Sequence, residues 1–169
     1  PSEQYYLYYV ESWRELVDKS APLQDMVDAI KNEIFFNGPI SAAYVVKSDF
    51  QSFFQSNPKS IYRASSDAKF RGIHTSVIIG WGAEPDAEGV TTNYWLVVNS
   101  WGESFANNGF FKIAMGECEI ESNSITVGVP KIPQDGDKKR ANVRVVQNAL
   151  KHTGAKVGSK HKVKLDDEI

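Results

Sequence analysis

The fold is decided by two apolar runs, IHTSVIIGWG at residues 73–82 and YWLVVNSWG at residues 94–102. Both runs are rich in β-branched and aromatic residues, which favour strands. The segment between them, from Pro85 to Thr92, carries Asp, Glu and Gly and is typical of a loop. The pattern therefore predicts two neighbouring antiparallel strands, at residues 73–81 and 94–99.

A helix is predicted upstream of these strands. Ser20 is a candidate N-cap, Pro22 suits the first turn because its missing N–H costs nothing there, and Asn37-Gly38-Pro39 ends the helix. The apolar residues between these signals recur at the spacing of one helical face: Leu23, Met26, Val27, Ile30 and Ile34.

Short β-like runs occupy much of the remaining sequence. They cover residues 5–10, 40–46, 109–115 and 124–129. One helix followed by a series of strands indicates an α+β domain with an antiparallel sheet or a small barrel.

The composition is that of an ordinary globular protein of 169 residues, with 41% hydrophobic and 24% charged residues. No apolar run approaches the roughly 18–20 residues of a membrane-spanning helix. An integral membrane protein is therefore not expected.

Charge is distributed unevenly along the chain. Residues 1–130 carry 9 Lys and Arg against 16 Asp and Glu, whereas residues 131–169 carry 10 against 5. We therefore expect a domain at residues 1–133 and a basic extension, partly helical or disordered, at residues 134–169. Three readings of the extension stay open: a solvated tail, a binding segment for an acidic partner, membrane surface or nucleic acid, and a self-association segment.

His74 and Asn99 form a candidate catalytic pair. A histidine at the start of a strand is more often structural when it stands alone, but here an amide ends the next apolar strand. A catalytic imidazole needs one ring nitrogen for proton exchange and the other held by a hydrogen bond. A neutral amide can hold that nitrogen when the nucleophile is a thiolate, and the indole of Trp101 would exclude water from the bond.

Several further motifs follow one another in a fixed order. They are Gly38-Pro39-Ile40, Tyr44-x4-Asp49-Phe50, Gly72-Ile73-His74, Ile79-Gly80-Trp81-Gly82, Tyr94-Trp95-Leu96-Val97, Asn99-Ser100-Trp101-Gly102, Gly109-Phe110-Phe111-Lys112-Ile113 and Cys118-Glu119-Ile120-Glu121-Ser122. Over roughly residues 5–133, this order resembles the C-terminal half of papain-like cysteine peptidases. Gly80-Trp81 and the Cys-x-Ile-Glu-Ser string are similar to the cathepsin B-like branch.

The resemblance implies a fold and a catalytic apparatus. The fold is the right-hand, β-barrel-like antiparallel domain of papain-like enzymes, with one N-terminal helix. His74 corresponds to the catalytic histidine, which acts as general base, and Asn99 to the asparagine that orients it. Trp101 corresponds to the indole that shields this pair and borders the subsites for the leaving group.

The resemblance also implies a substrate pocket. Ala42 and Ala43 are expected on the wall of the S2 pocket and Asn123 on its floor, where many cathepsin B-like enzymes have a glutamate. An uncharged floor favours an apolar substrate side chain. The family implies peptide or protein substrates and a lysosomal, vacuolar or secreted location. No cofactor or metal is expected, because the sequence has no His/Cys cluster with ligand spacing.

Two departures from the family pattern affect the expected site. Ile73 and Thr75 stand where the family usually has small residues beside its histidine, so we expect them to crowd His74. Phe105-Ala106 stands where the family has a second Trp-Gly pair.

The nucleophile is the largest departure. Cys118 is the only cysteine of the chain and matches a structural position of the family. No Cys-Gly-x-Cys-Trp string, oxyanion-hole glutamine or occluding loop is present. Because the thiolate forms the covalent intermediate, we expect this chain alone to be inactive.

Two interpretations remain open. In the first, the chain is part of a cathepsin B-like cysteine peptidase whose nucleophile lies on an upstream segment, and that segment or another partner covers the face carrying His74 and Trp101. In the second, the chain is a catalytically inactive, peptidase-derived domain that acts as a structural or binding subunit.

Overall fold

The structure, a computed structural model, describes residues 9–85 and 89–131. The basic extension at residues 134–169 and most of the strand expected at residues 5–10 lie outside the described residues. Residues 10–129 form one unit by themselves. No helix among the described residues is long and apolar enough to cross a membrane.

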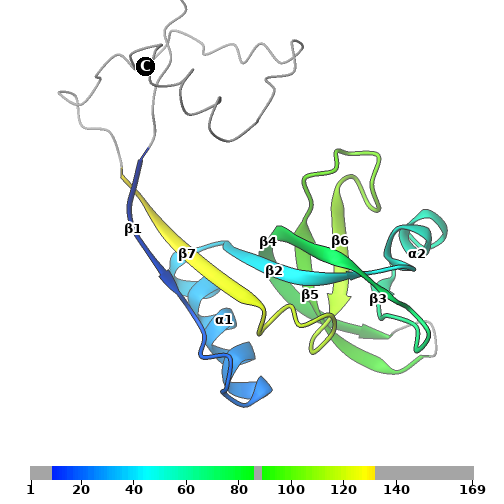
Figure 1. Cartoon of the computed structure of the whole chain (residues 1–169), viewed down its shortest axis with the longest axis horizontal. Helices are drawn as coiled ribbons and strands as arrows, with labels where there is room; N and C mark the ends of the chain where they lie inside the picture. Colours follow the sequence, from blue (N-terminus) through cyan, green and yellow to red (C-terminus); the bar gives the residue numbers. More distant parts are fainter. Residues whose placement is uncertain (1–8, 86–88, 132–169) are drawn as a thin grey trace, which may run out of the picture. The chain divides into compact units, whose positions relative to one another are not determined.

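Two helices and seven strands lie within the described residues (Figure 1). In chain order they are β1 (Tyr9–Glu15), α1 (Leu23–Asn37), β2 (Ile40–Lys47), α2 (Phe50–Ser56), β3 (Ile61–Tyr62), β4 (Phe70–Pro85), β5 (Thr91–Val98), β6 (Phe110–Ala114) and β7 (Ser124–Lys131). The predicted strands at residues 40–46, 73–81, 94–99, 109–115 and 124–129 are confirmed, with ends shifted by a few residues. The predicted class, α+β, is confirmed as well.

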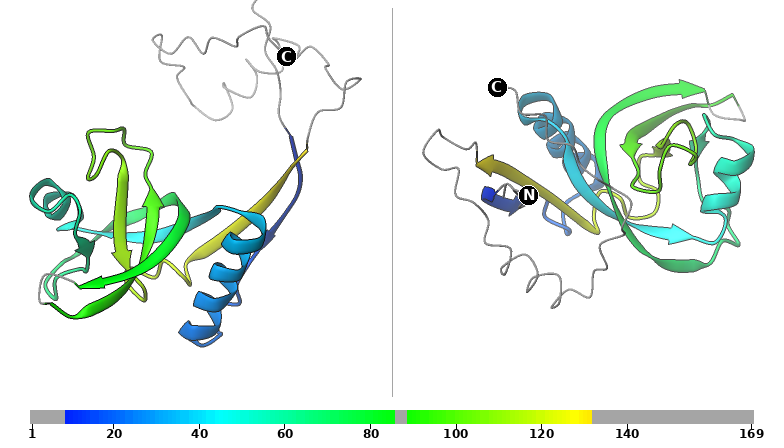
Figure 2. Two further views of the ribbon diagram at one scale, coloured as in Figure 1. Left: turned by 180° about the vertical axis from the view of Figure 1, so that it is seen from behind. Right: turned by 90° about the horizontal axis from the view of Figure 1, so that it is seen from above.

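The strands form one sheet in the order β1-β7-β2-β4-β5-β6-β3. The pairs β7–β2, β2–β4, β4–β5 and β5–β6 run antiparallel, and the short pair β3–β6 runs parallel. The sheet is open, because β1 and β3 are edge strands, so the expected barrel does not close. Figure 2 shows β4 as a long and strongly curved strand, which bends the sheet around the core.

Helix α1 packs part of its predicted apolar stripe on the core. Met26, Val27 and Ile30 are buried and Ile34 is partly buried, whereas Leu23, in the first turn, is 47% exposed. Gly38 ends the helix with a φ of 110°, a conformation that glycine adopts readily, and its N–H bonds to the carbonyls of the last turn. The predicted start at Ser20 is wrong. Pro22 is the N-cap, and Ser20 instead donates its N–H and its hydroxyl to the Asp18 carboxylate.

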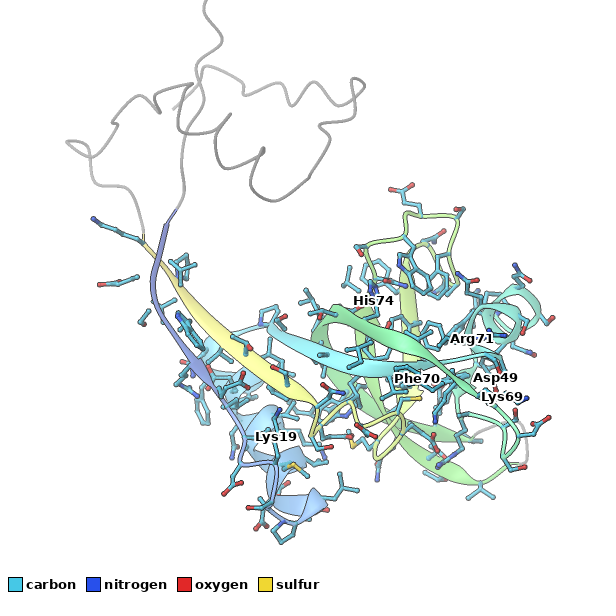
Figure 3. All side chains as sticks on the ribbon, in the orientation of Figure 1. Lys19, Asp49, Lys69, Phe70, Arg71 and His74 are labelled. Atoms are coloured by element: carbon cyan, nitrogen blue, oxygen red, sulfur yellow. The ribbon has the colours of Figure 1, made fainter. Side chains whose placement is uncertain are left out.

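Helix α2 and strand β3 were not predicted, and Asp49 ties them together. One carboxylate oxygen of Asp49 accepts a 2.7 Å hydrogen bond from the Tyr62 hydroxyl, and the other accepts a 2.9 Å bond from the Ser65 N–H. Figure 3 shows Asp49 at the end of β2, where α2 begins. The acidic side chain therefore fixes the segment that returns the chain to the sheet edge.

The core beside α2 is a cluster of aromatic rings. Phe50 is fully buried, and the rings packed around it lie 4.9–6.0 Å away between centroids: Tyr44, Phe54, Tyr62, Trp101, Phe105 and Phe111. Most of these pairs meet edge to face, the arrangement that aromatic quadrupoles favour. This cluster forms a rigid base for the segment that follows β5.

Candidate active site

The predicted pair of His74 and Asn99 comes together in the structure. His74 lies on β4, near the loop that joins β5 to β6 (Figure 3). β5 ends at Val98, which is paired with Val77 of β4, and Asn99 follows directly. The Nε2 atom of His74 lies 2.9 Å from Oδ1 of Asn99.

The backbone N–H of Ser100 identifies which end of the Asn99 amide faces the imidazole. It donates a 2.8 Å hydrogen bond to Oδ1 of Asn99. An N–H can only donate, so the atom that it shares with His74 is the oxygen rather than the NH₂ group. Nε2 of His74 therefore carries the proton, and Nδ1 is the free base in the neutral ring.

Trp101 packs against the His74 imidazole. Its ring stacks on the His74 imidazole at a centroid distance of 4.9 Å and an interplanar angle of 29°. Phe50 and Phe105 hold the indole by edge contacts, at 5.9 Å and 4.9 Å. The imidazole is thus fixed in plane by Asn99 and in orientation by the indole.

Two buried hydroxyls adjoin the pair and were not predicted as site residues. The Ser76 Oγ atom lies 3.4 Å from Oδ1 of Asn99 and 3.4 Å from the Tyr44 hydroxyl. Both side chains are buried. The only sequence signal is that Ser76 is polar at an alternate position of β4 that faces the core, in line with His74.

Ile73 and Thr75 do not crowd the imidazole. Successive side chains of a strand point to opposite faces. Both residues are exposed, with Ile73 at 61%, whereas His74 is half-buried and Ser76 is buried. The expected crowding is therefore absent from β4.

The expected S2 residues separate into two environments. Ala42 is 1% exposed and packs in the hydrophobic core, whereas Ala43 is half-buried. The sheet register pairs Ala43 with Thr75 on one side and with Ser124, the neighbour of Asn123, on the other. Thr75 joins this row, a position that sequence reasoning did not assign to the pocket.

Cys118 has the properties of a structural thiol. It is 8% exposed, packs in the hydrophobic core and has its backbone C=O bonded to the Val45 N–H. Burial, and to a smaller extent the negative charge of Glu117, raises the pKa of its thiol to about 11. A thiol of this kind carries little thiolate at neutral pH.

A pocket of about 550 Å³ lies next to the indole of Trp101. Its other lining residues come from α2, the turn that follows it and the loop after β5: Gln51, Phe54, Gln55, Pro58, Ser104, Phe105 and Ala106. Within residues 9–85 and 89–131, no group of three or more His, Cys, Asp and Glu side chains is arranged to hold a metal ion.

The curated relatives of the chain include cathepsin B-like cysteine proteinases. The chain is 43% identical to cathepsin B-like cysteine proteinase 3 of Caenorhabditis elegans over 108 residues. This aligned segment is 63% of this chain and 26% of that protein. It is 34% identical to cathepsin B-like cysteine proteinase 1 of Ostertagia ostertagi over 123 residues, a segment that is 72% of this chain and 30% of that protein. The chain thus spans less than a third of the length of these relatives.

Solved structures give the same picture. Procathepsin B S9 from Trypanosoma congolense superposes with a TM-score of 0.58 at 28% identity, over 75% of this chain and 38% of that chain. Digestive procathepsin L2 from Tenebrio molitor shares the fold with a TM-score of 0.52 at 23% identity, over 71% and 34%. A sequence profile of the papain family cysteine proteases matches residues 7–127. The chain therefore belongs to the papain family of cysteine proteases and is similar to its cathepsin B-like members.

Proposed function

We propose that this chain supplies the general base and its orienting amide to a cathepsin B-like cysteine peptidase, whose nucleophilic thiol lies outside the 169 residues. The observation that carries the proposal is the 2.9 Å contact between His74 Nε2 and Asn99 Oδ1 beneath the Trp101 ring. The buried Cys118 does not fit the role of nucleophile. Residues 1–133 would then be the carboxyl-terminal half of the peptidase domain.

The geometry fits the proton transfers of peptide-bond hydrolysis, in which His74 exchanges the proton and Asn99 holds the ring. Nδ1 of His74 takes the proton of the thiol, and the thiolate attacks the peptide carbonyl carbon. As the C–N bond breaks, Nδ1 returns the proton to the leaving amine and a thioester remains. Water then attacks the thioester, with His74 again accepting a proton, which restores the thiol and releases the acid. Asn99 keeps the Nε2 proton in place throughout.

The exposed face of β4 supports the expectation of a partner. Ile73 and Val77 are 61% and 40% exposed, although each is a large apolar residue. Two exposed apolar side chains at alternate positions of one strand are a contact surface or an aggregation hazard. We propose that the thiol-bearing segment, or a protein that replaces it, covers the face that carries His74 and Trp101 and also shields Ile73 and Val77.

We propose, further, that the S2 pocket prefers apolar side chains. Ala43 and Thr75 are register partners, Ser124 is the partner of Ala43 on its other side, and Asn123 precedes Ser124 in the chain. None of these side chains carries a charge, so a basic substrate side chain would find no ion-pair partner among them. The substrates are peptides or proteins, and a lysosomal, vacuolar or secreted location is the family expectation.

A second function is supported by the state of Cys118. The chain's one cysteine is buried and has a raised thiol pKa, so it does not suit nucleophilic attack. If no other segment supplies a catalytic thiol, the chain is an inactive, peptidase-derived structural or binding subunit. The Phe105-Ala106 replacement beside Trp101 agrees with relaxed requirements on the site.

The two functions are separated by labelling the protein purified from its natural source with a thiol-directed epoxide, followed by peptide mapping. The first function predicts a label on a cysteine other than Cys118. In recombinant protein that contains the labelled segment, His74→Ala should abolish labelling, whereas the exposed variant Lys59→Ala should not change it.

Absence of any label on folded protein under reducing conditions supports the binding subunit. A label on Cys118 contradicts both proposals, because each assigns this thiol a structural role.

A further inference from the structure

We infer that the hydroxyls of Tyr44 and Ser76 are positioning groups that orient the Asn99 amide, and through it set the tautomer of His74. The inference rests on the proposed role of His74 and Asn99. It adds a buried relay that the family resemblance does not supply, because it depends on two side chains that only the strand register brings together.

The register places both hydroxyls behind the catalytic pair. Tyr44 of β2 is the register partner of His74 of β4, and their rings meet edge to face at 5.8 Å. Ser76 follows His74 by two positions, so its side chain lies on the same face of the strand. The Ser76 Oγ atom is then 3.4 Å from both the Tyr44 hydroxyl and Oδ1 of Asn99.

Burial determines the direction of the hydroxyl protons. Tyr44 is fully buried, and Ser76 is the hydrogen-bond partner that the structure gives its hydroxyl. Burial raises the pKa of Tyr44, so its proton stays on and needs an acceptor. If Tyr44 donates to Ser76, the Ser76 proton is free for Oδ1 of Asn99. Both protons are satisfied only in this order.

The relay acts on the one anchored end of the amide. Oδ1 of Asn99 faces His74, Ser100 and Ser76, all with protons to donate. At the other end, Nδ2 is buried and has no hydrogen-bond partner within the part of the chain that the structure describes. A flipped amide would place its NH₂ group against these three donors. Each donor on Oδ1 therefore disfavours the flip that would remove the proton acceptor from His74.

The two hydroxyl contacts are secondary to the bonds from Ser100 and His74. At 3.4 Å they are longer than the 2.7–2.8 Å common for hydroxyl donors. Long hydrogen bonds are usual in catalytic sites without substrate. We therefore expect the relay to shift the population of the correct amide orientation, not to create it.

The test is the tautomer of His74, read from long-range ¹H–¹⁵N correlations of the full chain at a pH where the ring is neutral. His74→Gln assigns the signals among the three histidines. In the unmodified chain we expect the Nε2–H form. Ser76→Ala should raise the Nδ1–H form to about one molecule in ten, a typical minor-state population. Tyr44→Phe should have a smaller effect, because Ser76 can still donate to Asn99.

Two matched variants separate positioning from mere stability. Ile78→Val removes buried volume from the same face of β4 but no hydroxyl, and should leave the tautomer unchanged. Ser76→Thr keeps the hydroxyl and should retain the Nε2–H form. If Ser76→Ala does not fold, Ser76→Cys replaces the hydroxyl with a weak donor and is read in the same way.

Each outcome decides one question. An unchanged Nε2–H spectrum in folded Ser76→Ala overturns the relay and leaves the proposed function intact. An equal shift in Ile78→Val also overturns it, because loss of packing would then explain the effect. An Nδ1–H form in the unmodified chain contradicts the proposed function as well as the relay.

Discussion

The indole N–H of Trp95 donates a 2.7 Å hydrogen bond to the carboxylate of Glu121, and both side chains are buried. The same carboxylate oxygen accepts a 2.8 Å bond from the Gly116 N–H. No Lys, Arg or His forms an ion pair with Glu121 among residues 9–85 and 89–131. Burial is the main cause that raises the pKa of Glu121 above its ordinary value of 4.5. The loop before β7 is thus tied to β5 by an acid that resists ionisation.

Replacing Glu121 with Gln should stabilise the protein relative to the parent, and this difference should grow as pH rises. The raised pKa means that the folded state binds the proton more tightly than the unfolded state does. The carboxyl therefore favours folding below about pH 4.5, and this contribution is lost as pH rises through the folded-state pKa. Gln keeps an oxygen for Trp95 and does not ionise. Urea unfolding should show that the free energy of unfolding of the variant, measured relative to that of the parent, rises by about 1 kcal/mol between pH 4.5 and pH 8.

The exposed Glu103 provides the control for this comparison. Glu103→Gln should show no such pH trend. A difference between Glu121→Gln and its parent that stays constant with pH would mean that Glu121 is ionised equally easily in both states.

The main strands and the catalytic pair could be predicted because their signals are local. Alternating or continuous apolar residues mark β4 and β5, and the pair stands at the boundaries of those runs. Helix α2 could not be predicted, since seven residues hold too few helical turns for periodicity. β3 has two residues and exists only because it pairs with β6.

The buried polar network was beyond sequence reasoning for a different reason. Tyr44 and Ser76 are 32 positions apart, and only the β2–β4 register joins them. Ser20 was misplaced as a helix cap because Asp18 competes for its hydroxyl and N–H, which forms a local turn instead. Positions 42 and 43 are both alanine, so the residue type does not show which of them is buried. The alternation of side chains along the strand places Ala42 in the core.

Cys118 should react slowly with thiol reagents in the folded chain. Its pKa of about 11, against an ordinary value of 9.0, lowers the thiolate fraction at neutral pH by roughly 100-fold, and burial restricts access further. Labelling with a disulfide reagent should therefore be at least about 100-fold faster in urea than in buffer. Equal rates in a chain shown to be folded would contradict a structural role for this thiol.

Asp49→Asn should destabilise the fold at neutral pH. Burial opposes ionisation of Asp49, but its hydrogen bonds from Ser65 and Tyr62 outweigh burial and lower its pKa below 3.8. The carboxylate therefore stabilises the fold above about pH 3.8, and this contribution is lost as pH falls through the lower folded-state pKa. Loss of the charged acceptor should cost about 1–3 kcal/mol at pH 7.

Urea unfolding at pH 7 and at pH 3 measures this effect. The gap between Asp49→Asn and the parent should narrow at the lower pH. Asp67→Asn, at an exposed position, should match the parent at both. A gap that is as wide at pH 3 would assign the loss to packing around Tyr62 instead of to charge.

Asn123→Glu should broaden the S2 pocket toward basic side chains in peptidase that carries its thiol. A carboxylate at position 123, next to the row of Ala43, Thr75 and Ser124, would pair with an arginine two residues before the scissile bond. The ratio of kcat/KM for arginine over phenylalanine peptides should rise at least about tenfold, which corresponds to about 1.4 kcal/mol. Asn93→Glu, at an exposed position of β5, is a control for general electrostatic attraction, and an equal rise there would remove Asn123 from the pocket floor.

Ala106→Gly should stabilise the loop that carries Trp101. Ala106 has a φ of 46°, a left-handed conformation that costs an alanine roughly 1–2 kcal/mol and a glycine little. The gain is partly offset because glycine has more freedom in the unfolded chain, so the free energy of unfolding should rise by about 0.5–1 kcal/mol. Ala83→Gly, at an exposed position in β4, should instead lower it by about 0.5–1 kcal/mol. Thermal unfolding of both variants measures the contrast. If both lower Tm alike, Ala106 is not strained, and the replacement of Gly at this position carries no energetic cost for the loop.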